Sequence, residues 1–234
     1  GGRNTPLSRP ATRAKPKPAR LGETMPSATA GAARLLPACL DSLAPFRKAG
    51  DPIVVVDNGS RDSTGTIARE RGFELVVERR PGRGRAVAAG YREVRGRARW
   101  VLVIHADMIV APGTREALSA AIAASPEPVA GALGHRIDDE RTVFRVIEAG
   151  NRLRARFLAI PYGDQAQFWS IAAIEASSGF PDLDRYEDLD LALRLRRLGR
   201  VIYVDHPVTI PSRHWDGGVL RATLKNWQIA LRAA

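Results

Sequence analysis

Residues Trp100–Pro112 read WVLVIHADMIVAP, and the interpretation of the whole chain starts from this stretch. Val101–His105 is a short apolar run of the kind that forms strands buried on both faces of a sheet. Asp107 follows that run almost at once, and ligands of open α/β sheets bind just outside the carboxyl ends of the strands. An Asp at this place can also cap a turn or the helix that begins near Pro112. The stretch therefore predicts an α/β protein in which Asp107 either binds a ligand or caps a turn.

Length and composition predict a single domain. The chain has 234 residues, of which 44% are hydrophobic and 26% charged, as in ordinary globular proteins. Cys39 is the only cysteine, which excludes an internal disulfide framework and a cysteine-based zinc site. No apolar run is long enough for a transmembrane helix and no secretory signal opens the sequence, so the expected location is the cytoplasm.

The charge of the chain points to an anionic partner. The formal net charge is +11, with a pI near 10.8, which favours nucleotides, nucleic acid or anionic lipid. Residues 1–22 contribute six basic residues and no acid, and residues 1–30 are expected to be a disordered or aberrant tail before a domain at 31–234. Aromatic residues form no series of the type that single-strand binders use for stacking.

Helical and strand patterns alternate along the domain, which indicates parallel strands joined by crossovers. Thr24–Gly31 is small, polar and interrupted by Pro26, so no strand is expected there. Helices are expected at 33–48, 62–71, 85–94, 114–124, 141–158 and 187–198, together with a basic amphipathic helix at 219–234. Strands are expected at 53–56, 74–78, 101–105, 129–136, 168–171 and 201–204, with turns or loops at 161–165 and 211–218.

Two further segments carry charges that suit a ligand. Gly82 and Gly84 permit tight turns before a helix, with Arg83 and Arg85 beside them; a helix N-terminus with guanidinium groups suits a phosphate, although such loops are often solvated surface. Glu187, Asp188 and Asp190 stand together at the start of another helix. Favourable interaction with the helix dipole explains such acids without any further function.

The ordered set of these motifs resembles family-2 glycosyltransferases of the GT-A fold. It consists of Val55–Ser60 with Asp62 and Thr64, His105–Asp107, Gly179–Pro181 and Glu187–Asp188, and the similarity runs from about Asp51 to the end of the chain. The His-Ala-Asp form, with Tyr162–Gln165 and Arg213–Trp215, is similar to a bacterial subgroup. The resemblance implies a single GT-A (Rossmann-like) domain, with a mostly parallel sheet flanked by helices.

The resemblance also implies how a nucleotide-sugar donor is bound. Asp57 corresponds to the acid that holds the base or ribose, and the nucleotide site is expected to include Asn58, Gly59, Ser60, Arg83, Arg85 and His105. Asp107 corresponds to the second acid of an Asp-x-Asp motif that binds Mn²⁺ or Mg²⁺ on the diphosphate, with His214 as a further ligand. A hard divalent cation prefers carboxylate oxygen, whereas the His105 that replaces the first acid suits softer cations.

For catalysis, the resemblance assigns Glu187 and Asp188 to the acceptor side. Asp188 corresponds to the general base that takes the proton of the acceptor hydroxyl in an inverting displacement. Trp215, Asp164 and Gln165 are expected near the acceptor; a packed Trp215 and a surface His214 are the alternatives. The family opens with an Ile/Val-rich strand that helps to hold the nucleotide, and Thr24–Gly31 departs from it, which predicts an altered N-terminal segment and a weakened or inactive relative as one outcome.

The resulting prediction is a metal-dependent, inverting transfer of sugar from a nucleotide-sugar to a hydroxyl acceptor on a glycan or lipid. No nucleic acid partner is expected, and the basic C-terminal helix suggests peripheral contact with the inner face of the membrane. The alternatives are a GT-A-like nucleotidyltransferase and a basic module that binds nucleic acid or an anionic surface. Neither alternative needs a base on the acceptor side, so the pair Glu187–Asp188 argues against both.

Overall fold

The computed structural model describes residues 21–25, 32–158 and 163–215. These residues form, in order, β1 (Leu21–Met25), α1 (Ala32–Ser42), α2 (Ala44–Lys48), β2 (Ile53–Asp57), α3 (Thr64–Glu70), β3 (Glu74–Val77), α4 (Arg83–Val94), β4 (Trp100–Val103), β5 (Ile109–Val110), α5 (Thr114–Ala124), β6 (Pro128–Asp138), α6 (Thr142–Leu158), η1 (Gly163–Gln165), β7 (Gln167–Ser170), α7 (Ile171–Ala176), α8 (Glu187–Leu195), β8 (Arg200–Pro211) and η2 (Ser212–Trp215).

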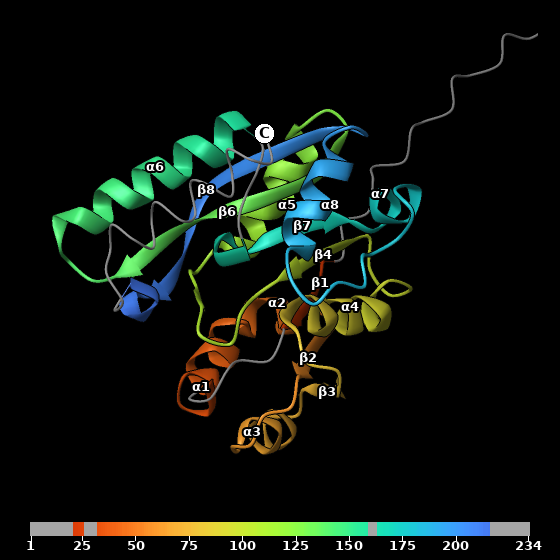
Figure 1. Cartoon of the computed structure of the whole chain (residues 1–234), viewed down its shortest axis with the longest axis vertical. Helices are drawn as coiled ribbons and strands as arrows, with labels where there is room; N and C mark the ends of the chain where they lie inside the picture. The colour runs from red at the N-terminus through yellow and green to blue at the C-terminus, as the bar shows by residue number, and fades with distance from the viewer. Residues whose placement is uncertain (1–20, 26–31, 159–162, 216–234) are drawn as a thin grey trace, which may run out of the picture.

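All of the strands named above belong to one sheet, in the order β3-β2-β1-β4-β7-β6-β8-β5 (Figure 1). The neighbours β3, β2, β1 and β4 run parallel, as do β6 and β8, whereas β7 and β5 are antiparallel to their neighbours. The predicted mostly parallel α/β sheet is therefore confirmed. Because β2 and β4 both run parallel to β1, their carboxyl ends lie at the same edge of the sheet, where Asp57 and the segment after Val103 meet.

The sequence interpretation was wrong about the first strand. Leu21–Met25 forms β1 between β2 and β4, within the segment expected to be a tail, and this strand includes Thr24 and Met25. Its sequence, LGETM, has no run of β-branched residues, so no pattern announces a strand. Two parallel neighbours supply its backbone hydrogen bonds, and such tertiary pairing overrides local propensity. The expected tail at 1–20 and 26–30 lies outside the described residues.

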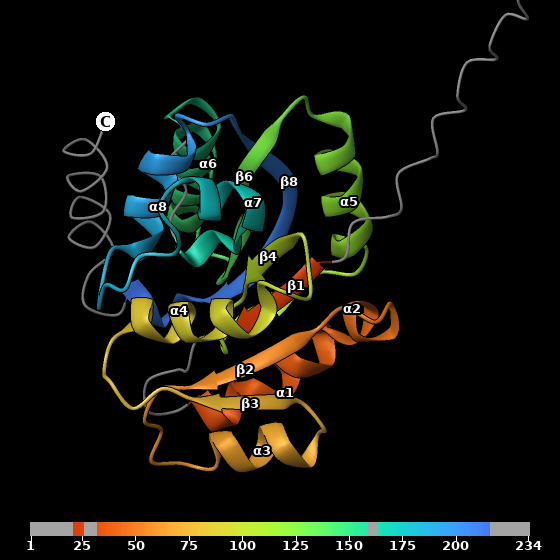
Figure 2. The same cartoon turned by 90° about the vertical axis from the view of Figure 1, so that its right-hand side faces the viewer.

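Alternate residues of the central strands enter two hydrophobic cores, one on each face of the sheet. Ile53 and Val55 of β2 belong to one core, and Val54 and Val56 to the other. β4 divides in the same way, because successive side chains of a strand point to opposite faces. Helices α1, α2, α3, α5 and α6 contribute to the first core, and α4, α7 and α8 to the second. Figure 2 shows α5 and α8 on opposite sides of β6 and β8.

Most predicted elements are present, with shifted boundaries. The single helix expected at 33–48 is divided at Leu43 into α1 and α2, and Pro45 lies in the first turn of α2, where its missing N–H removes no hydrogen bond. Pro37 lies inside α1, beyond its first turn. The short elements β5 and α7 were not predicted, since each is too short to show a period. The predicted helix at 219–234 lies outside the described residues, as do Pro161 and Tyr162.

Within the described parts of the chain, no helix is both long enough and apolar enough to span a bilayer.

Gly131 of β6 provides a direct test of this packing. A Cβ atom there would lie 2.3 Å from Cζ of the fully buried Phe168 and 2.5 Å from the carbonyl oxygen of Ile202. Gly131→Ala should therefore lower the free energy of unfolding by about 1–3 kcal/mol, measured by urea denaturation. Gly96→Ala is the control, because nothing lies within 4 Å of the Cβ position there, and its effect should stay within about 0.5 kcal/mol or be stabilising. Equal effects of the two variants would contradict the packing of β6 between β7 and β8.

Candidate active site

The loop after β2 is shaped by Asp57. Its Oδ1 accepts a hydrogen bond from the backbone N–H of Ser60 at 2.8 Å, across a turn in which Gly59 has φ of +80°. Its Oδ2 lies 3.3 Å from the Cβ position of Gly65, so the carboxylate faces the first turn of α3. The structure thus places Asp57 at the predicted edge of the sheet.

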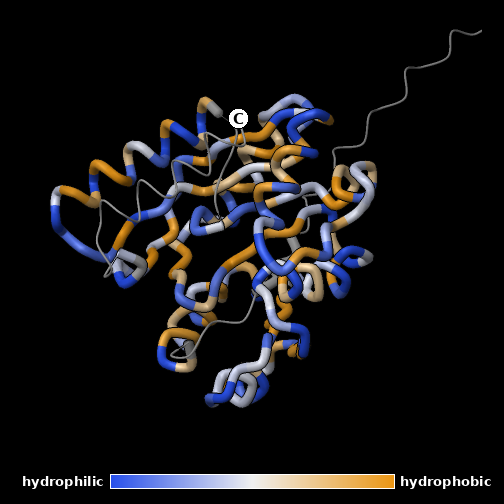
Figure 3. The backbone as a smooth tube through the Cα atoms, in the orientation of Figure 1, coloured by the Kyte–Doolittle hydropathy of each residue, from blue (hydrophilic) through white to orange (hydrophobic). Residues whose placement is uncertain are grey.

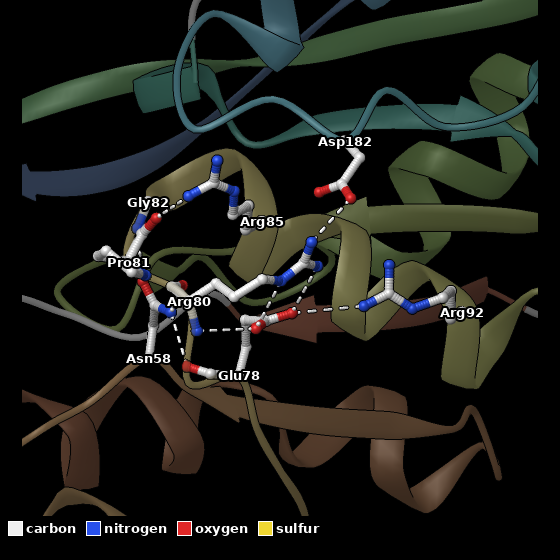
Figure 4. Close-up of polar contacts among 8 residues, drawn as sticks. All are labelled: Asn58, Glu78, Arg80, Pro81, Gly82, Arg85, Arg92 and Asp182. Carbon is white, nitrogen blue, oxygen red and sulfur yellow. Dashed lines mark hydrogen bonds and ion pairs between the residues drawn. The ribbon is translucent and has the colours of Figure 1, made fainter.

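Asn58 connects this loop to the segment between β3 and α4 (Figure 4). Its Nδ2 donates to the carbonyl oxygens of Glu78 at 2.8 Å and Arg80 at 2.7 Å, and its Oδ1 accepts from the backbone N–H of Gly82 at 3.1 Å. Each of these partners belongs to the protein itself. In this structure, therefore, the Asn58 side chain fixes the segment that leads into α4 instead of offering an open amide to a nucleotide.

Glu78 and Arg80 extend the same network, and the sequence interpretation missed both. The Glu78 carboxylate pairs with Arg80 at 3.1 Å and with Arg92 of α4 at 3.5 Å, and Arg80 also pairs with Asp182 at 2.9 Å (Figure 4). Hydrogen bonds from Arg80 are the main reason why the pKa of Glu78 falls from 4.5 to about 2. The loop after β3 is thereby tied to the loop before α8. The available signal was a strand-like run, Glu74–Val77, followed directly by Glu78 and two arginines.

Arg83, at the start of α4, joins the two predicted catalytic acids. Its Nε donates to Oε1 of Glu187 at 2.9 Å, and a terminal nitrogen lies 2.8 Å from Oδ2 of Asp188. Asp188 Oδ2 also accepts the backbone N–H of Gly163 at 3.0 Å, and Oδ1 accepts that of Leu189 at 2.9 Å. The predicted arginine and both acids are therefore brought together, along with η1.

Glu187 and Asp188 differ in what they can contact. Glu187 is 2% exposed, and burial raises its pKa, while Arg83 acts in the opposite direction. A Cβ on Gly84 would lie 2.8 Å from Oε2 of Glu187, so α4 covers this carboxylate. The prediction that Glu187 is catalytic is not supported by this geometry, because the side chain cannot touch a substrate while α4 covers it. Glu187 pairs with Arg83, and Asp188, which is 7% exposed, pairs with the same arginine and with the backbone N–H of Gly163.

The glycines of the loop serve helix packing more than phosphate binding. A Cβ on Gly84 would lie 2.4 Å from the carbonyl oxygen of Leu183, and one on Gly82 would lie 2.8 Å from Cα of Asp184. The backbone N–H of Gly84 donates to the carbonyl of Asp184 at 3.3 Å. The segment before α8 thus occupies part of the N-terminus of α4 that was predicted to receive a phosphate.

Arg83 and Arg85, which the sequence interpretation grouped together, have different surroundings. Arg85 donates to the carbonyl oxygen of Pro81 at 2.9 Å, within its own loop (Figure 4), whereas Arg83 reaches the acids of α8. Arg83 is therefore the arginine that contacts the two predicted catalytic acids.

His105 and Asp107 follow β4 at the same edge. Burial, followed by the charge of Arg83, lowers the pKa of His105 to about 4, so the imidazole is neutral at pH 7. The charges of Asp107, Asp164 and Asp188 act on it in the opposite direction, so these three carboxylates lie within electrostatic range of His105. The His105 carbonyl accepts the N–H of Met108 at 2.9 Å and so closes a tight turn.

Asp107 is already paired with a cation in this structure. A terminal nitrogen of Arg213 in η2 lies 2.6 Å from its Oδ2, and the Asp107 side chain is 11% exposed. Among the described residues, no group of three or more His, Cys, Asp or Glu could hold a metal ion. The side chain of His214, predicted as a further ligand, lies outside the described residues. Asp107 is thus the described residue that corresponds to the predicted metal ligand.

A buried polar network lies behind η1. Arg154 of α6 is 2% exposed and donates to Oδ1 of Asn151 at 2.9 Å and to Oε1 of Gln165 at 3.1 Å. Asn151 is in turn 3.2 Å from Nε2 of His135 on β6, and burial lowers the pKa of that histidine. Gln165, predicted near an acceptor, is 1% exposed and belongs to this network. Its role in this structure is to hold η1, and the Arg within the helical pattern of α6 was the only sign of such a network.

Asp164 and Trp215 complete the predicted acceptor side. Oδ1 of Asp164 is buried without a hydrogen-bond partner among the described residues, and the charge of Asp164 acts on both His105 and His135. Trp215 is 5% exposed and packs edge-on against Phe144, with 5.6 Å between the ring centroids. Its indole is therefore packed in the first core in this structure, as the alternative reading of the sequence held.

The pKa of Glu78 predicts a stability effect that depends on pH. Because the folded pKa is lowered from 4.5 to about 2, the ionised carboxylate stabilises the fold fully above pH 4.5, and this contribution is lost as the pH falls toward 2. Glu78→Gln should therefore be less stable than the parent at pH 7, and the difference in free energy of unfolding should shrink between pH 4.5 and 2. Glu70→Gln, on the exposed surface of α3, is the control and should cost much less at pH 7. A difference for Glu78→Gln that does not change with pH would contradict the ion-pair explanation.

Two known proteins are similar to this chain over part of its sequence. A curated but uncharacterized glycosyltransferase of Mycobacterium tuberculosis is 49% identical over 55 residues, and a glycosyltransferase of Mycobacterium bovis matches equally. These matches cover 24% of this chain and about a quarter (23%) of the length of each relative.

Solved structures match over more of the chain. Glucosyl-3-phosphoglycerate synthase from Mycobacterium tuberculosis, in complex with Mn²⁺, uridine diphosphate and glucosyl-3-phosphoglycerate, has a TM-score of 0.66 at 19% identity, covering 91% of this chain and 78% of that chain. TarS from S. aureus has a TM-score of 0.63 at 16% identity, covering 83% of this chain and 61% of that chain. At such identities the likeness shows the fold, which is that of GT-A glycosyltransferases.

The family itself is shown by a match to the chain's own sequence. The model of the family described as Glycosyl transferase family 2 matches residues 27–177, which include β2, β4 and η1. This span is well over half of the chain, and the protein therefore belongs to glycosyltransferase family 2.

Proposed function

We propose that this glycosyltransferase moves a sugar from a nucleoside diphosphate donor to a hydroxyl acceptor, with Asp188 as the general base and a divalent metal at Asp107. The observation that carries the proposal is that Asp107 and Asp188 both lie within electrostatic range of His105, at the edge of the sheet where β2 ends in Asp57. The neighbouring structures support the choice of donor and metal, since glucosyl-3-phosphoglycerate synthase was solved with uridine diphosphate and either Mn²⁺ or Mg²⁺, and TarS with UDP-GlcNAc.

The residues present suit a metal bound through one carboxylate. Asp107 already pairs with the guanidinium of Arg213, so its position attracts positive charge. Mg²⁺ and related ions are commonly held by one or two carboxylates together with substrate phosphates and water, without a cage of protein ligands. When bound, the ion would neutralise the charge that develops on the departing diphosphate. Arg213, released from Asp107, would remain close to the same phosphates.

Asp188 is placed for proton transfer. Two backbone N–H groups and Arg83 fix the orientation of its carboxylate. In the proposed reaction, Asp188 takes the proton of the acceptor hydroxyl as that oxygen attacks the anomeric carbon from the face opposite the diphosphate, which inverts the configuration. Asp164, with a buried oxygen that lacks a partner among the described residues, is the group that we assign to the acceptor hydroxyls.

Arg83 couples the two halves of this site. Without a ligand, its guanidinium is shared between Glu187 and Asp188. An anionic diphosphate nearby would compete for the same guanidinium, because charge-assisted hydrogen bonds to phosphate are strong. Movement of Arg83 toward the donor would leave Asp188 able to accept a proton, so donor binding would prepare the base.

The metal assignment predicts the behaviour of Asp107→Asn. The amide keeps the size of the side chain but removes its negative charge, so Mn²⁺ should no longer strengthen binding of a nucleoside diphosphate. Thermal shift with UDP, with and without Mn²⁺, measures this, because a ligand of the folded state raises its apparent stability. Asp205→Asn is the control, since Asp205 is a surface carboxylate that lies 3.8 Å from Arg152. If the metal-dependent thermal shift persists in Asp107→Asn, the metal binds at another residue and the assignment to Asp107 is wrong.

The base assignment predicts a loss of rate in Asp188→Asn. The variant keeps the size of the side chain but loses the basic carboxylate and its ion pair with Arg83, so transfer should slow by about 10²-fold or more while the variant stays folded at the assay temperature and still binds the donor. Asp190→Asn is the matched control on the same helix, where the carboxylate pairs with Arg194 at 2.8 Å. Sugar transfer to a panel of acceptors, with the anomeric configuration of the product, is the measurement. Normal transfer by Asp188→Asn would remove this residue from the mechanism, and pyrophosphate released from a nucleoside triphosphate would instead indicate a nucleotidyltransferase.

A further inference from the structure

An apolar stripe on α6 faces away from both cores. Val143, Val146, Leu153 and Phe157 are 38%, 66%, 54% and 76% exposed. Their spacing of three, seven and four residues places them along one side of the helix. The opposite side of α6 is buried, with Phe144 and Ile147 in the first core.

The arrangement of α6 in the molecule leaves this stripe at the periphery. Figure 1 shows α6 along one margin of the structure, beside β6 and β8. In Figure 3, hydrophobic segments recur from turn to turn along α6, between hydrophilic ones. Exposure of such apolar side chains to water is unfavourable. Large exposed apolar patches mark surfaces that bind a partner or a membrane.

Positive charge accompanies the stripe. Arg152 and Arg156 are exposed beside Leu153 and Phe157, and Arg152 lies 3.8 Å from the exposed Asp205 of β8. The guanidinium of Arg145 is turned inward, where it donates to the carbonyl oxygens of Ile137 and Asp139. The single acid of α6, Glu148, is turned inward, where it accepts the backbone N–H of Ile137 at 2.6 Å and pairs with Arg145 at 2.9 Å. The outer side of α6 therefore combines apolar side chains with arginines and carries no exposed acid of its own.

We propose that this side of α6 lies on the surface of a membrane that contains anionic lipid. Helices with an apolar face bordered by Arg bind in the plane of the interface, through buried apolar area and attraction to anionic headgroups. The charge of α6 favours an anionic membrane over a second copy of the chain or its own residues 219–234. A second copy that paired α6 with α6 would bring arginines together, and residues 219–234 contain Arg221, Lys225 and Arg232 but no acid. Nucleic acid would match the charge but would leave the apolar stripe in water.

The test is co-sedimentation with vesicles of phosphatidylcholine, with and without phosphatidylglycerol. The full chain should bind the anionic vesicles and not the neutral ones, and binding should weaken with salt. Phe157→Glu should lower the partition coefficient at least ten-fold, and Leu153→Glu should act in the same direction. The matched control is Val77→Glu, which changes a 52% exposed residue of β3 far from α6 in both Figures 1 and 2 and should bind as the parent does. Unchanged melting temperatures establish that each variant is folded.

Several outcomes would overturn the proposal. These are absence of binding by the parent, equal binding by Phe157→Glu and the parent, and equal loss in Val77→Glu. Light scattering covers the remaining case: a dimer that Phe157→Glu dissociates, without any binding to vesicles, would make the stripe an interface between copies. Binding to vesicles needs no nucleotide or metal, so its failure would leave the proposed sugar transfer standing, and failure of that transfer would leave membrane binding standing.

Discussion

The ion pairs of Arg83 with Glu187 and Asp188 hold the site together. They connect the first turn of α4 to the first turn of α8, across 104 residues of sequence in the case of Glu187. Both helices present the positive end of their dipole there, and α4 begins with arginines and no acid. The two carboxylates of α8 supply the negative charge that this arrangement requires. Gly84 allows the helices to approach closely enough for the pairing, because a Cβ would strike Glu187 and the carbonyl of Leu183.

The sequence was informative wherever a period or a strand end was visible. Asp57 and Asp107 follow buried runs of apolar residues, and both lie at the predicted edge of the sheet. The acids Glu187 and Asp188 were recognised together, yet only packing distinguishes them: Gly84 of α4 faces the Glu187 carboxylate, whereas Asp188 accepts the backbone N–H of Gly163. A linear pattern contains no information about which of two adjacent acids a distant glycine will face.

Most of the features that the sequence could not predict depend on tertiary contacts. Asn58, Glu78 and Arg80 bind backbone and side chains of loops that meet only in the folded state, and Arg154 looks like any other arginine of an amphipathic helix. The sequence does not indicate whether the indole of Trp215 is packed in the core or exposed. In the structure it packs against Phe144, a residue distant in the sequence. The His-Ala-Asp subgroup and the roles of the individual site residues remain predictions.

The strand that the sequence concealed sets an order on how the chain can assemble. β1 lies at the centre of the parallel part of the sheet, yet it pairs with β2 at Ile53–Val55 and with β4 at Trp100–Val103. On the ribosome, Leu21–Met25 emerges before either partner, and the second partner is made only some 75 residues later. Until then one backbone edge of this strand has no mate, and such unpaired edges are prone to association with other chains. The sequence LGETM is only weakly hydrophobic, which made the strand hard to recognise. The same property lowers the tendency of the unpaired strand to aggregate before β4 has been synthesised.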